Sequence, residues 1–402
     1  MQKIYLFILA LALSMNAFSQ EIKPGAYQTS EYLPALKGKR IGLFANHTAT
    51  IGNKHLVDTL VSLGMNITKA FGPEHGFRGT ADAGEKVGDY KDAATGIPVI
   101  SLYGKKRRPS ADDLQDVDVM LFDIQDVGTR FYTFISSLEE FINSAIENNK
   151  PLIILDRPNP NGFYVDGPVL DTAYKSFVGM QPIPMVYGMT MGEYAKMLIG
   201  EKWAKAAITA TTLPNITIIK NKNYTHKSKY VLPVKPSPNL GTMASVYWYG
   251  SNCLFEGTVL SEGRGTDFPF AIFGHPSLPK TLYRFTPTSR DGAKEPKLKD
   301  QVCYGWNLSG TDKDVLQKVD GKIQLGYLIE AYKLFPEKEK FFITPKSGKP
   351  TDYFFNKLAG NDALQKQIIA GVSEKEIRAS WAEGLNAFKK IRKKYLLYTD
   401  FE

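Results

Sequence analysis

Short runs of apolar residues recur along the first half of the chain, and stretches with helical spacing separate them. The runs cover residues 40–46, 67–71, 97–103, 117–123, 151–156 and 216–219. In residues 55–64 and 131–149, apolar side chains instead recur every three or four positions, which is typical of an amphipathic helix. Nearly continuous apolar strands that alternate with helices predict a parallel sheet covered on both faces, and therefore an α/β fold.

Polar clusters directly follow four of these predicted strands. They are Asn46-His47-Thr48, Glu74-His75, Asp123-Ile124-Gln125-Asp126 with Arg130, and Asp156-Arg157-Pro158-Asn159. In open α/β sheets, ligands bind beyond the carboxyl ends of the strands. Because four strand ends deliver polar groups to one edge, the pattern predicts a functional site there.

The pattern becomes less regular in the second half. Residues 231–241 contain three prolines, which favours an ordered extended segment, and we expect a domain junction near it. A polar, glycine-rich stretch follows at residues 256–267, and helical spacing returns at 324–334 and 377–391. Ser373 and Glu376 have the spacing of a capping box at the start of the last helix.

The first residues predict a leader that is removed before the protein folds. A short basic start precedes an apolar run over residues 4–13, which is too short to span a bilayer, and small residues follow before position 20. We therefore expect residues 1–19 to be a secretory signal peptide. The mature protein is expected to be exported, periplasmic or secreted, without a membrane anchor.

The formal net charge of +9 favours anionic partners such as cell-wall polymers, lipid or nucleic acid. The basic runs at residues 105–108 and 389–394 are interpreted as solvated surface, and no recognisable motif supports binding of nucleic acid. Export would permit a disulfide between Cys253 and Cys303, but the sequence leaves open whether the two thiols meet.

The loop at residues 71–80 is interpreted as the centre of the site. It places Glu74, His75 and Arg78 among three glycines and a proline. Glycine and proline favour a tightly fixed turn, so the loop would present a carboxylate, an imidazole and a guanidinium in one rigid arrangement. The alternative is a capped turn with solvated charges.

Cleavage of a glycosidic bond needs an acid for the leaving oxygen and usually a second carboxylate. Glu74 and Glu262 both lie in glycine-containing loops, on opposite sides of the expected junction, so a cleft between domains would bring them together. A salt bridge between Glu262 and Arg264 is the structural alternative. Further candidate carboxylates are Asp123, Asp126 and Asp267.

Three arginines in glycine-containing loops indicate an acidic substrate, because a guanidinium binds a carboxylate through two parallel hydrogen bonds. They are Arg78, Arg130 and Arg264. Aromatic residues such as Tyr132 lie between them in the sequence and could cover the apolar face of a sugar ring.

A zinc site is the competing interpretation. Its ligands would come from His47, His75, His275, Asp123 and Asp126, but no pair of them has the HExxH spacing. No GxGxxG follows a predicted strand and no GxxxxGK[ST] occurs, so nucleotide binding has no support. We expect no cofactor.

Several long motifs occur in the same order as in the exo-β-N-acetylmuramidases of the NamZ type, which the chain resembles over almost its whole mature length. They are Gly72-Pro73-Glu74-His75-Gly76, the run from Phe122 to Tyr132, Asp156-Arg157-Pro158-Asn159-Pro160, Pro236-Ser237-Pro238-Asn239 and Ser261-Glu262-Gly263-Arg264-Gly265-Thr266. The resemblance implies a glycoside hydrolase that removes N-acetylmuramic acid from the non-reducing end of peptidoglycan fragments. It also implies a Rossmann-like N-terminal domain, a smaller C-terminal domain and a cleft between them.

These inferences combine into one prediction. Residues 20–240 form a Rossmann-like catalytic domain, and residues 241–402 form a smaller α/β domain that completes the cleft. The resemblance assigns the general acid to Glu74, whereas Glu262 is our own inference from the residues. The predicted catalytic residues are Glu74, Glu262 and Asp123, and the predicted substrate-binding residues are His75, Arg78, Asp126, Arg130, Tyr132, Asn159, Asn239 and Arg264. The alternatives are a non-catalytic binding protein for wall sugars and a metal-dependent peptidoglycan amidase.

Overall fold

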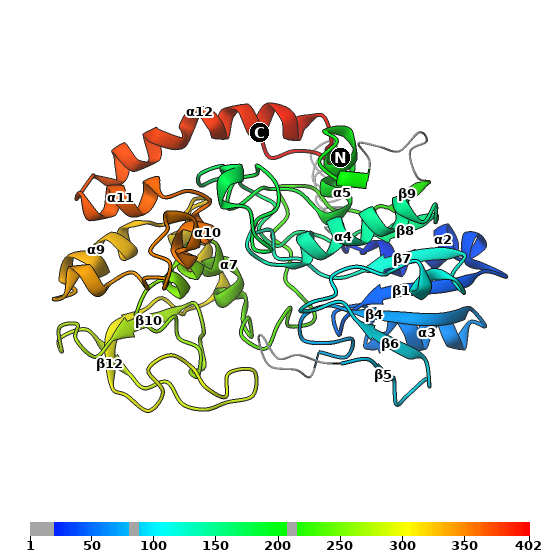
Figure 1. Cartoon of the computed structure of the whole chain (residues 1–402), viewed down its shortest axis with the longest axis horizontal. Helices are drawn as coiled ribbons and strands as arrows, with labels where there is room; N and C mark the ends of the chain where they lie inside the picture. The colour runs from blue at the N-terminus through cyan, green and yellow to red at the C-terminus, as the bar shows by residue number, and fades with distance from the viewer. Residues whose placement is uncertain (1–19, 80–87, 207–214) are drawn as a thin grey trace, which may run out of the picture.

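The computed structural model describes residues 20–79, 88–206 and 215–402, so the predicted signal peptide lies outside the described residues. A seven-stranded sheet forms the first half of the chain, and helices with a three-stranded sheet form most of the second half (Figure 1). Within the described ranges, none of the helices combines the length and the apolar character that crossing a membrane requires.

The large sheet has the strand order that the alternating pattern implies. From one edge to the other, its strands are β5 (Tyr90–Lys91), β6 (Pro98–Ser101), β4 (Asn66–Gly72), β1 (Arg40–Ala45), β7 (Val119–Asp123), β8 (Leu152–Leu155) and β9 (Ile216–Ile219). Every neighbouring pair is parallel except β5 with β6. The six parallel strands therefore follow the Rossmann order, with the third, second and first strands on one side of the fourth, fifth and sixth. The predicted α/β fold is confirmed.

Alternate side chains of each strand face opposite sides of the sheet. Ile41 and Leu43 of β1 pack with α2 (Thr29–Leu36) and α3 (Leu56–Ser62). Phe44 faces the other side and packs with Phe141 of α4 (Phe134–Glu147), and α5 (Met191–Gly200) belongs to the same cluster. Helices thus bury both faces, which is why the strands are apolar almost throughout.

The second half is mainly helical. Its helices are α7 (Met243–Asn252), α8 (Asp312–Val319), α9 (Gly326–Leu334), α10 (Phe354–Ala359), α11 (Ala363–Ile369) and α12 (Glu374–Lys393). Its antiparallel sheet has the order β10 (Ile272–His275), β12 (Cys303–Asn307) and β11 (Tyr283–Phe285). The remaining elements are the hairpin of β2 (Thr50–Ile51) and β3 (Lys54–His55) and the short 3₁₀ helices η1 (Gly25–Tyr27), η2 (Asp112–Leu114), η3 (Thr172–Tyr174), η4 (Cys253–Gly257), η5 (Lys338–Lys340) and η6 (Pro350–Asp352).

The last helix ties the two halves together. The predicted capping box of Ser373 and Glu376 is present at its start, and Figure 1 shows α12 running along the top of the second half and ending near α5 of the first. After it, the tail returns to the large sheet, where Tyr398 Oη donates to Asp156 Oδ2 at 2.6 Å. Arg392 donates to the carbonyl of Gly188 at 2.9 Å. The C-terminal residues are therefore part of the packing of the first half.

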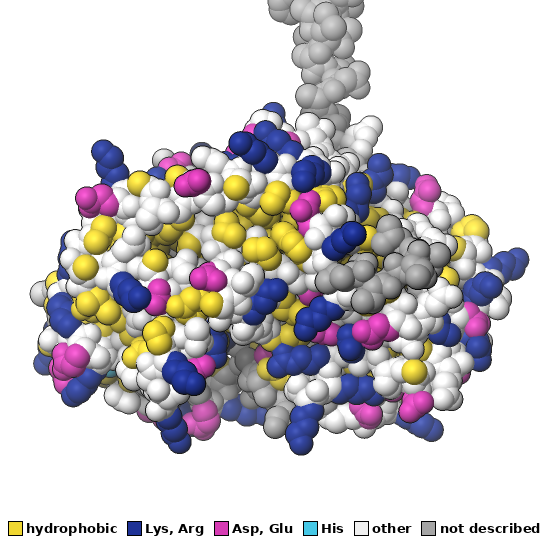
Figure 2. All heavy atoms as spheres, turned by 45° about the horizontal axis from the view of Figure 1, so that its top comes forward, with side chains coloured by type: hydrophobic (Ala, Val, Ile, Leu, Met, Phe, Trp, Pro, Cys, Tyr) yellow, Lys and Arg dark blue, Asp and Glu magenta, His cyan; other side chains and the backbone are white. Residues whose placement is uncertain are grey.

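Charged side chains are dispersed over the face of the molecule that Figure 2 shows. Figure 2 shows Lys and Arg side chains spread over the face in view, with Asp and Glu among them. Cys253 and Cys303 are both buried and free, so the two thiols form no disulfide in this structure. Most predicted elements are present within a residue or two of their expected bounds.

Candidate active site

The loop after β4 carries Glu74 out of the sheet at the predicted edge. β4 ends at Gly72 and the amide of Gly76 donates to the carbonyl of Pro73 at 3.0 Å, which closes a turn around Glu74 and His75. His75 has φ 70°, a left-handed conformation that is uncommon for a residue with a side chain. A non-glycine residue held in this region is frequently found at a functional site.

Two hydroxyl groups orient the carboxylate of Glu74. Tyr103 Oη donates to Oε1 at 3.1 Å, and Thr133 Oγ1 donates to Oε2 at 3.2 Å. Tyr103 follows β6, and Thr133 immediately precedes α4 without using its side chain to cap that helix. Donors from the segments that follow β6 and β7 therefore hold both carboxylate oxygens, while the side chain remains only half-buried.

Glu74 and His75 line a small cavity of about 70 Å³ between the two halves of the chain. Five aromatic side chains enclose it: Phe131, Tyr132, Phe134, Tyr249 and Phe270. Tyr249 of α7 contacts three of them edge-on, with ring centroids 5.3 Å from Phe131, 5.9 Å from Tyr132 and 4.7 Å from Phe270. The cavity thus lies between the two halves of the chain, and apolar rings surround its carboxylate.

Arg264 supplies the guanidinium of this cavity. It forms ion pairs with Glu256 and, at 3.1 Å, with Glu262 through the single atom Nη1. Its Cζ lies 5.0 Å from the ring centre of Phe270. Among the described residues, Arg264 Nε has no hydrogen-bond partner. A donor that is buried and unpaired is costly, so this nitrogen is available to an acceptor on a ligand.

The structure brings five of the eleven predicted site residues to this cavity. They are Glu74, His75, Tyr132, Asn239 and Arg264. Tyr132 Oη donates to the carbonyl of Pro236 at 2.7 Å, and Asn239 Nδ2 donates to the carbonyl of Gly292 at 2.8 Å. Tyr132 therefore joins the first half of the chain to the predicted junction segment, and Asn239 joins that segment to the second half.

The two other predicted catalytic carboxylates lie outside the cavity, each in ion pairs. Asp123 is fully buried and accepts from Arg157 Nε at 2.5 Å and Nη2 at 2.8 Å. Glu262 is also buried, and its Oε2 lies 2.8 Å from Lys297 Nζ. Burial alone would raise the pKa of Glu262, but the charges of Lys297 and Arg264 outweigh it and lower that pKa. Asp123 is thus bound to Arg157, and Glu262 is bound to Arg264 and Lys297.

The other two predicted arginines bind groups of the protein itself. Arg78 forms ion pairs with Asp58 at 2.9 Å and Asp92 at 2.8 Å, and these hydrogen bonds raise its pKa. Arg130 is completely buried and donates to the carbonyls of Pro168, Ile183 and Leu358 at 2.7 to 3.0 Å. Burial lowers the pKa of Arg130 to about 9. Neither guanidinium lines the cavity at Glu74, so their predicted contact with a substrate carboxylate has no geometric support.

Asp126 and Asn159 are buried behind the cavity. Asp126 accepts from the amide of Gly128 at 2.6 Å and from the hydroxyl of Tyr187, and burial raises its pKa to about 7. Asn159 Nδ2 donates to the carbonyl of Met189 at 2.8 Å. Both side chains hold the loops that follow β7 and β8, and neither reaches the cavity.

Several residues that line the cavity or bind Glu74 were not predicted from the sequence. Tyr103 ends the predicted strand 97–103 and Thr133 directly follows the motif that ends at Tyr132, so proximity to these stretches was an available signal. Ser237 lies inside a quoted motif but was not assigned a role. Tyr249 sits within the buried helix α7, where nothing in the sequence distinguishes a cavity side chain from a core side chain.

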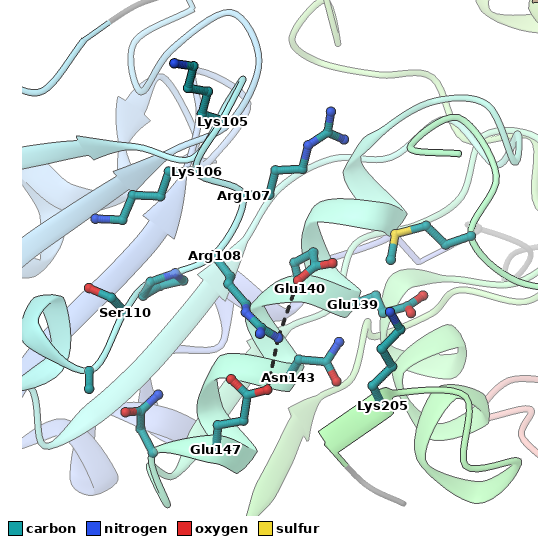
Figure 3. A pocket seen from close by; sticks show the side chains of 14 residues that line it. Lys105, Lys106, Arg107, Arg108, Ser110, Glu139, Glu140, Asn143, Glu147 and Lys205 are labelled. Atoms are coloured by element: carbon teal, nitrogen blue, oxygen red, sulfur yellow. Dashed lines mark ion pairs between the residues drawn. The ribbon is translucent and has the colours of Figure 1, made fainter. Parts of the chain in front are cut away.

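A larger hollow of about 640 Å³ lies elsewhere, along the basic segment 105–108 (Figure 3). Arg108 points between Glu140 and Glu147, with ion-pair distances of 3.7 and 3.0 Å. The charge of Arg108 is thus balanced within the protein, and no predicted site residue lines this hollow. Across the described ranges, no three His, Cys, Asp or Glu side chains meet in a way that could hold a metal ion.

The chain is similar to known proteins over almost its whole length. A family model described as "Exo-beta-N-acetylmuramidase NamZ, N-terminal" matches residues 41–244, and its C-terminal counterpart matches residues 247–398. The chain is 39% identical to the peptidoglycan beta-N-acetylmuramidase NamZ of Bacillus subtilis (strain 168), over 97% of this chain and 96% of that protein. It is also similar to two crystal structures of DUF1343 family proteins from Bacteroides fragilis. One has a TM-score of 0.84 with 44% identity, covering 95% of this chain and 100% of that one. The other has a TM-score of 0.76 with 28% identity, covering 94% and 99%.

Proposed function

Because the chain belongs to the NamZ family of exo-β-N-acetylmuramidases, we propose that it hydrolyses the β-glycosidic bond of N-acetylmuramic acid at the non-reducing end of peptidoglycan fragments. One observation carries the proposal. Glu74 stands in an aromatic cavity between the two halves of the chain, with each carboxylate oxygen held by a hydroxyl group.

Glu74 is the general acid of the proposed reaction. The bond to the leaving sugar breaks only if the leaving oxygen gains a proton, and a carboxyl group in hydrogen-bond reach supplies it. Tyr103 and Thr133 then stabilise the carboxylate that remains, because both donate to it. The fixed orientation also keeps the acid aimed at the cavity between turnovers.

The second catalytic group, which acts as base or nucleophile, is Glu262 or the substrate itself. Among the described residues that line the cavity, Glu74 is the sole carboxylate. Glu262 adjoins the cavity through Arg264, and it would act only after its ion pairs loosen. Unchanged turnover in Glu262→Gln would remove it, and the N-acetyl oxygen of the substrate would then take the step, as in substrate-assisted glycosidases.

Arg264 holds the lactyl carboxylate that distinguishes N-acetylmuramic acid from N-acetylglucosamine. Of the three predicted arginines it alone lines the cavity, and its Nε lacks a partner in the described part of the chain. In Arg264→Gln, KM should rise for a muramic acid glycoside and stay nearly constant for the glucosamine analogue. An equal change for both substrates would contradict this assignment.

The products test the proposed activity directly. The wild-type protein is incubated with the disaccharide that carries N-acetylmuramic acid at its non-reducing end, and separately with the disaccharide of reverse order. Mass spectrometry should detect free N-acetylmuramic acid from the first and no cleavage of the second. Binding of the first disaccharide without cleavage would instead support a non-catalytic wall-sugar binding protein, which needs the arginine and the aromatic rings but not Glu74.

Export is a further part of the proposal. Peptidoglycan lies outside the cytoplasmic membrane, and the leader predicted over residues 1–19 would deliver the protein there. The mature protein recovered from cell fractions should begin near Gln20. Recovery of an intact N-terminus from the cytoplasm alone would contradict export.

A further inference from the structure

A second hollow of about 520 Å³ adjoins the cavity at Glu74, and Arg264 lines both. The two hollows share a wall, because Asn239, which lines the first, donates to the carbonyl of Gly292, which lines the second, at 2.8 Å. Gly292 has φ 80°, and a Cβ there would lie 2.2 Å from Pro238 Cβ. This wall is therefore tightly packed, and only glycine fits at its centre.

The charges that line this hollow cancel. Three carboxylates, from Glu256, Glu262 and Glu295, face three cations, from Arg264, Lys294 and Lys297. Lys297 is fixed further, since its Nζ donates to the carbonyls of Phe255 at 2.9 Å and Thr258 at 3.0 Å. A polar lining without net charge suits a neutral, hydroxyl-rich ligand better than a phosphate or a carboxylate.

One aromatic ring interrupts this polar lining. Phe354, the first residue of α10, lines the hollow and leaves 38% of its surface exposed. An exposed ring among fixed polar groups combines the two features of a small-molecule site, an apolar contact surface and a few placed hydrogen-bonding groups. Sugars match this combination, because their rings have apolar faces and polar edges.

The volumes of the two hollows indicate which of them can hold a sugar unit. The cavity at Glu74, about 70 Å³, is far below the range of roughly 300–1,000 Å³ typical of ligand pockets, whereas the second hollow lies within it. A disaccharide therefore extends beyond the cavity that holds the acid. Arg264 lines both hollows, so the second hollow is a larger space that adjoins this cavity on the side of Arg264.

We propose that this second hollow binds the sugar on the leaving-group side of the scissile bond, an uncharged N-acetylglucosamine unit, with its ring stacked on Phe354. The inference rests on the proposed function, since it names where the rest of that substrate lies. It makes Phe354 a determinant of how well a natural disaccharide binds relative to a glycoside with a small leaving group.

The test compares Phe354→Ala with a matched control, Tyr283→Ala in β11. Tyr283 is likewise an exposed aromatic residue, at 47%, and does not line the hollow. For each protein, KM is measured with the muramic acid–glucosamine disaccharide and with a small chromogenic muramic acid glycoside. In Phe354→Ala, the ratio of the two KM values should rise roughly five- to tenfold, the loss expected from one partly buried aromatic contact. Tyr283→Ala should leave the ratio unchanged.

A ratio that stays constant in Phe354→Ala would overturn the proposal, as would an equal rise in both KM values, which indicates a purely structural role. A binding measurement separates this outcome from failure of the hydrolase assignment. Di-N-acetylchitobiose is titrated into the wild-type protein and into Phe354→Ala, and its binding to each is followed by NMR. If neither glycoside is cleaved but chitobiose binds the wild type and not Phe354→Ala, the sugar site stands and the proposed reaction fails. Equal binding to both, or to neither, refutes the site.

Discussion

Replacing Asp123 with Asn tests whether the carboxylate at the end of β7 is structural or catalytic. The side chains of Asp123 and Arg157 are 0% and 2% exposed, and they form two parallel hydrogen bonds of 2.5 and 2.8 Å. Asp123→Asn keeps the shape but removes the negative charge, which leaves a buried guanidinium without a counter-ion. Breaking one partner of such a pair costs roughly 3–5 kcal/mol.

The assay is urea unfolding at neutral pH, followed by tryptophan fluorescence. With an m-value of about 3 kcal/mol per molar urea, a loss of this size lowers the midpoint by roughly 1–1.7 M. Asp116→Asn is the matched control, because Asp116 pairs with Lys69 at 2.6 Å but is 43% exposed. An exposed pair contributes at most about 1 kcal/mol, so the control midpoint should move little.

A double variant refines the argument. Replacing both partners with apolar residues, Asp123→Leu with Arg157→Met, removes the unpaired charge and should recover part of the lost stability. The reasoning is refuted if Asp123→Asn unfolds at the wild-type midpoint while hydrolysis is abolished. Asp123 would then contact the substrate, as first predicted from its position in the sequence.

Three further outcomes are expected. Arg130→Met should lower the urea midpoint by a similar amount, because three buried carbonyls lose their donor; an unchanged midpoint would contradict this. Burial raises the pKa of Glu139 from 4.5 to about 7. The folded state therefore keeps a proton on Glu139 that the unfolded chain releases. The contribution of Glu139 to the free energy of unfolding is complete below about pH 4.5 and is lost as the pH rises through 7, with a slope of up to about 1.4 kcal/mol per pH unit. Glu139→Gln should flatten the fall of the urea midpoint between pH 5 and 8, and an unaltered slope would count against it. Dialysis against EDTA should leave hydrolysis unchanged, whereas a loss that zinc restores would favour the metal-dependent amidase.

The sheet could be predicted from the sequence because its signal is local. Each parallel strand is buried on both faces, so a run such as residues 117–123 is apolar whatever its neighbours are. The position of Glu74 followed from the same logic, since it comes directly after β4 and carboxyl ends meet at one edge. The direction of each strand and the burial of its side chains are sufficient to predict both the sheet and the position of Glu74.

The roles of the arginines could not be predicted in this way, because their partners are distant. Arg78, Arg130 and Arg264 all lie near glycines in polar loops and look alike in the sequence. Arg130 donates to the carbonyl of Leu358, 228 positions away, a contact that its local sequence does not indicate. Tyr249 presents the same difficulty, because α7 is buried on all sides and only the fold shows which of its faces meets the cavity.

The central claim is that Glu74 donates the proton to the leaving oxygen. Glu74→Gln tests it most directly, because the side chain keeps its shape and its amide oxygen can still accept from one of the two hydroxyl groups of Tyr103 and Thr133, while the acidic proton is lost. The measurement is kcat for a chromogenic β-N-acetylmuramic acid glycoside, with circular dichroism to verify folding. We predict that kcat falls by roughly a hundredfold or more, the scale of general acid catalysis. A kcat close to that of the wild type would contradict the account and move the acid to another residue.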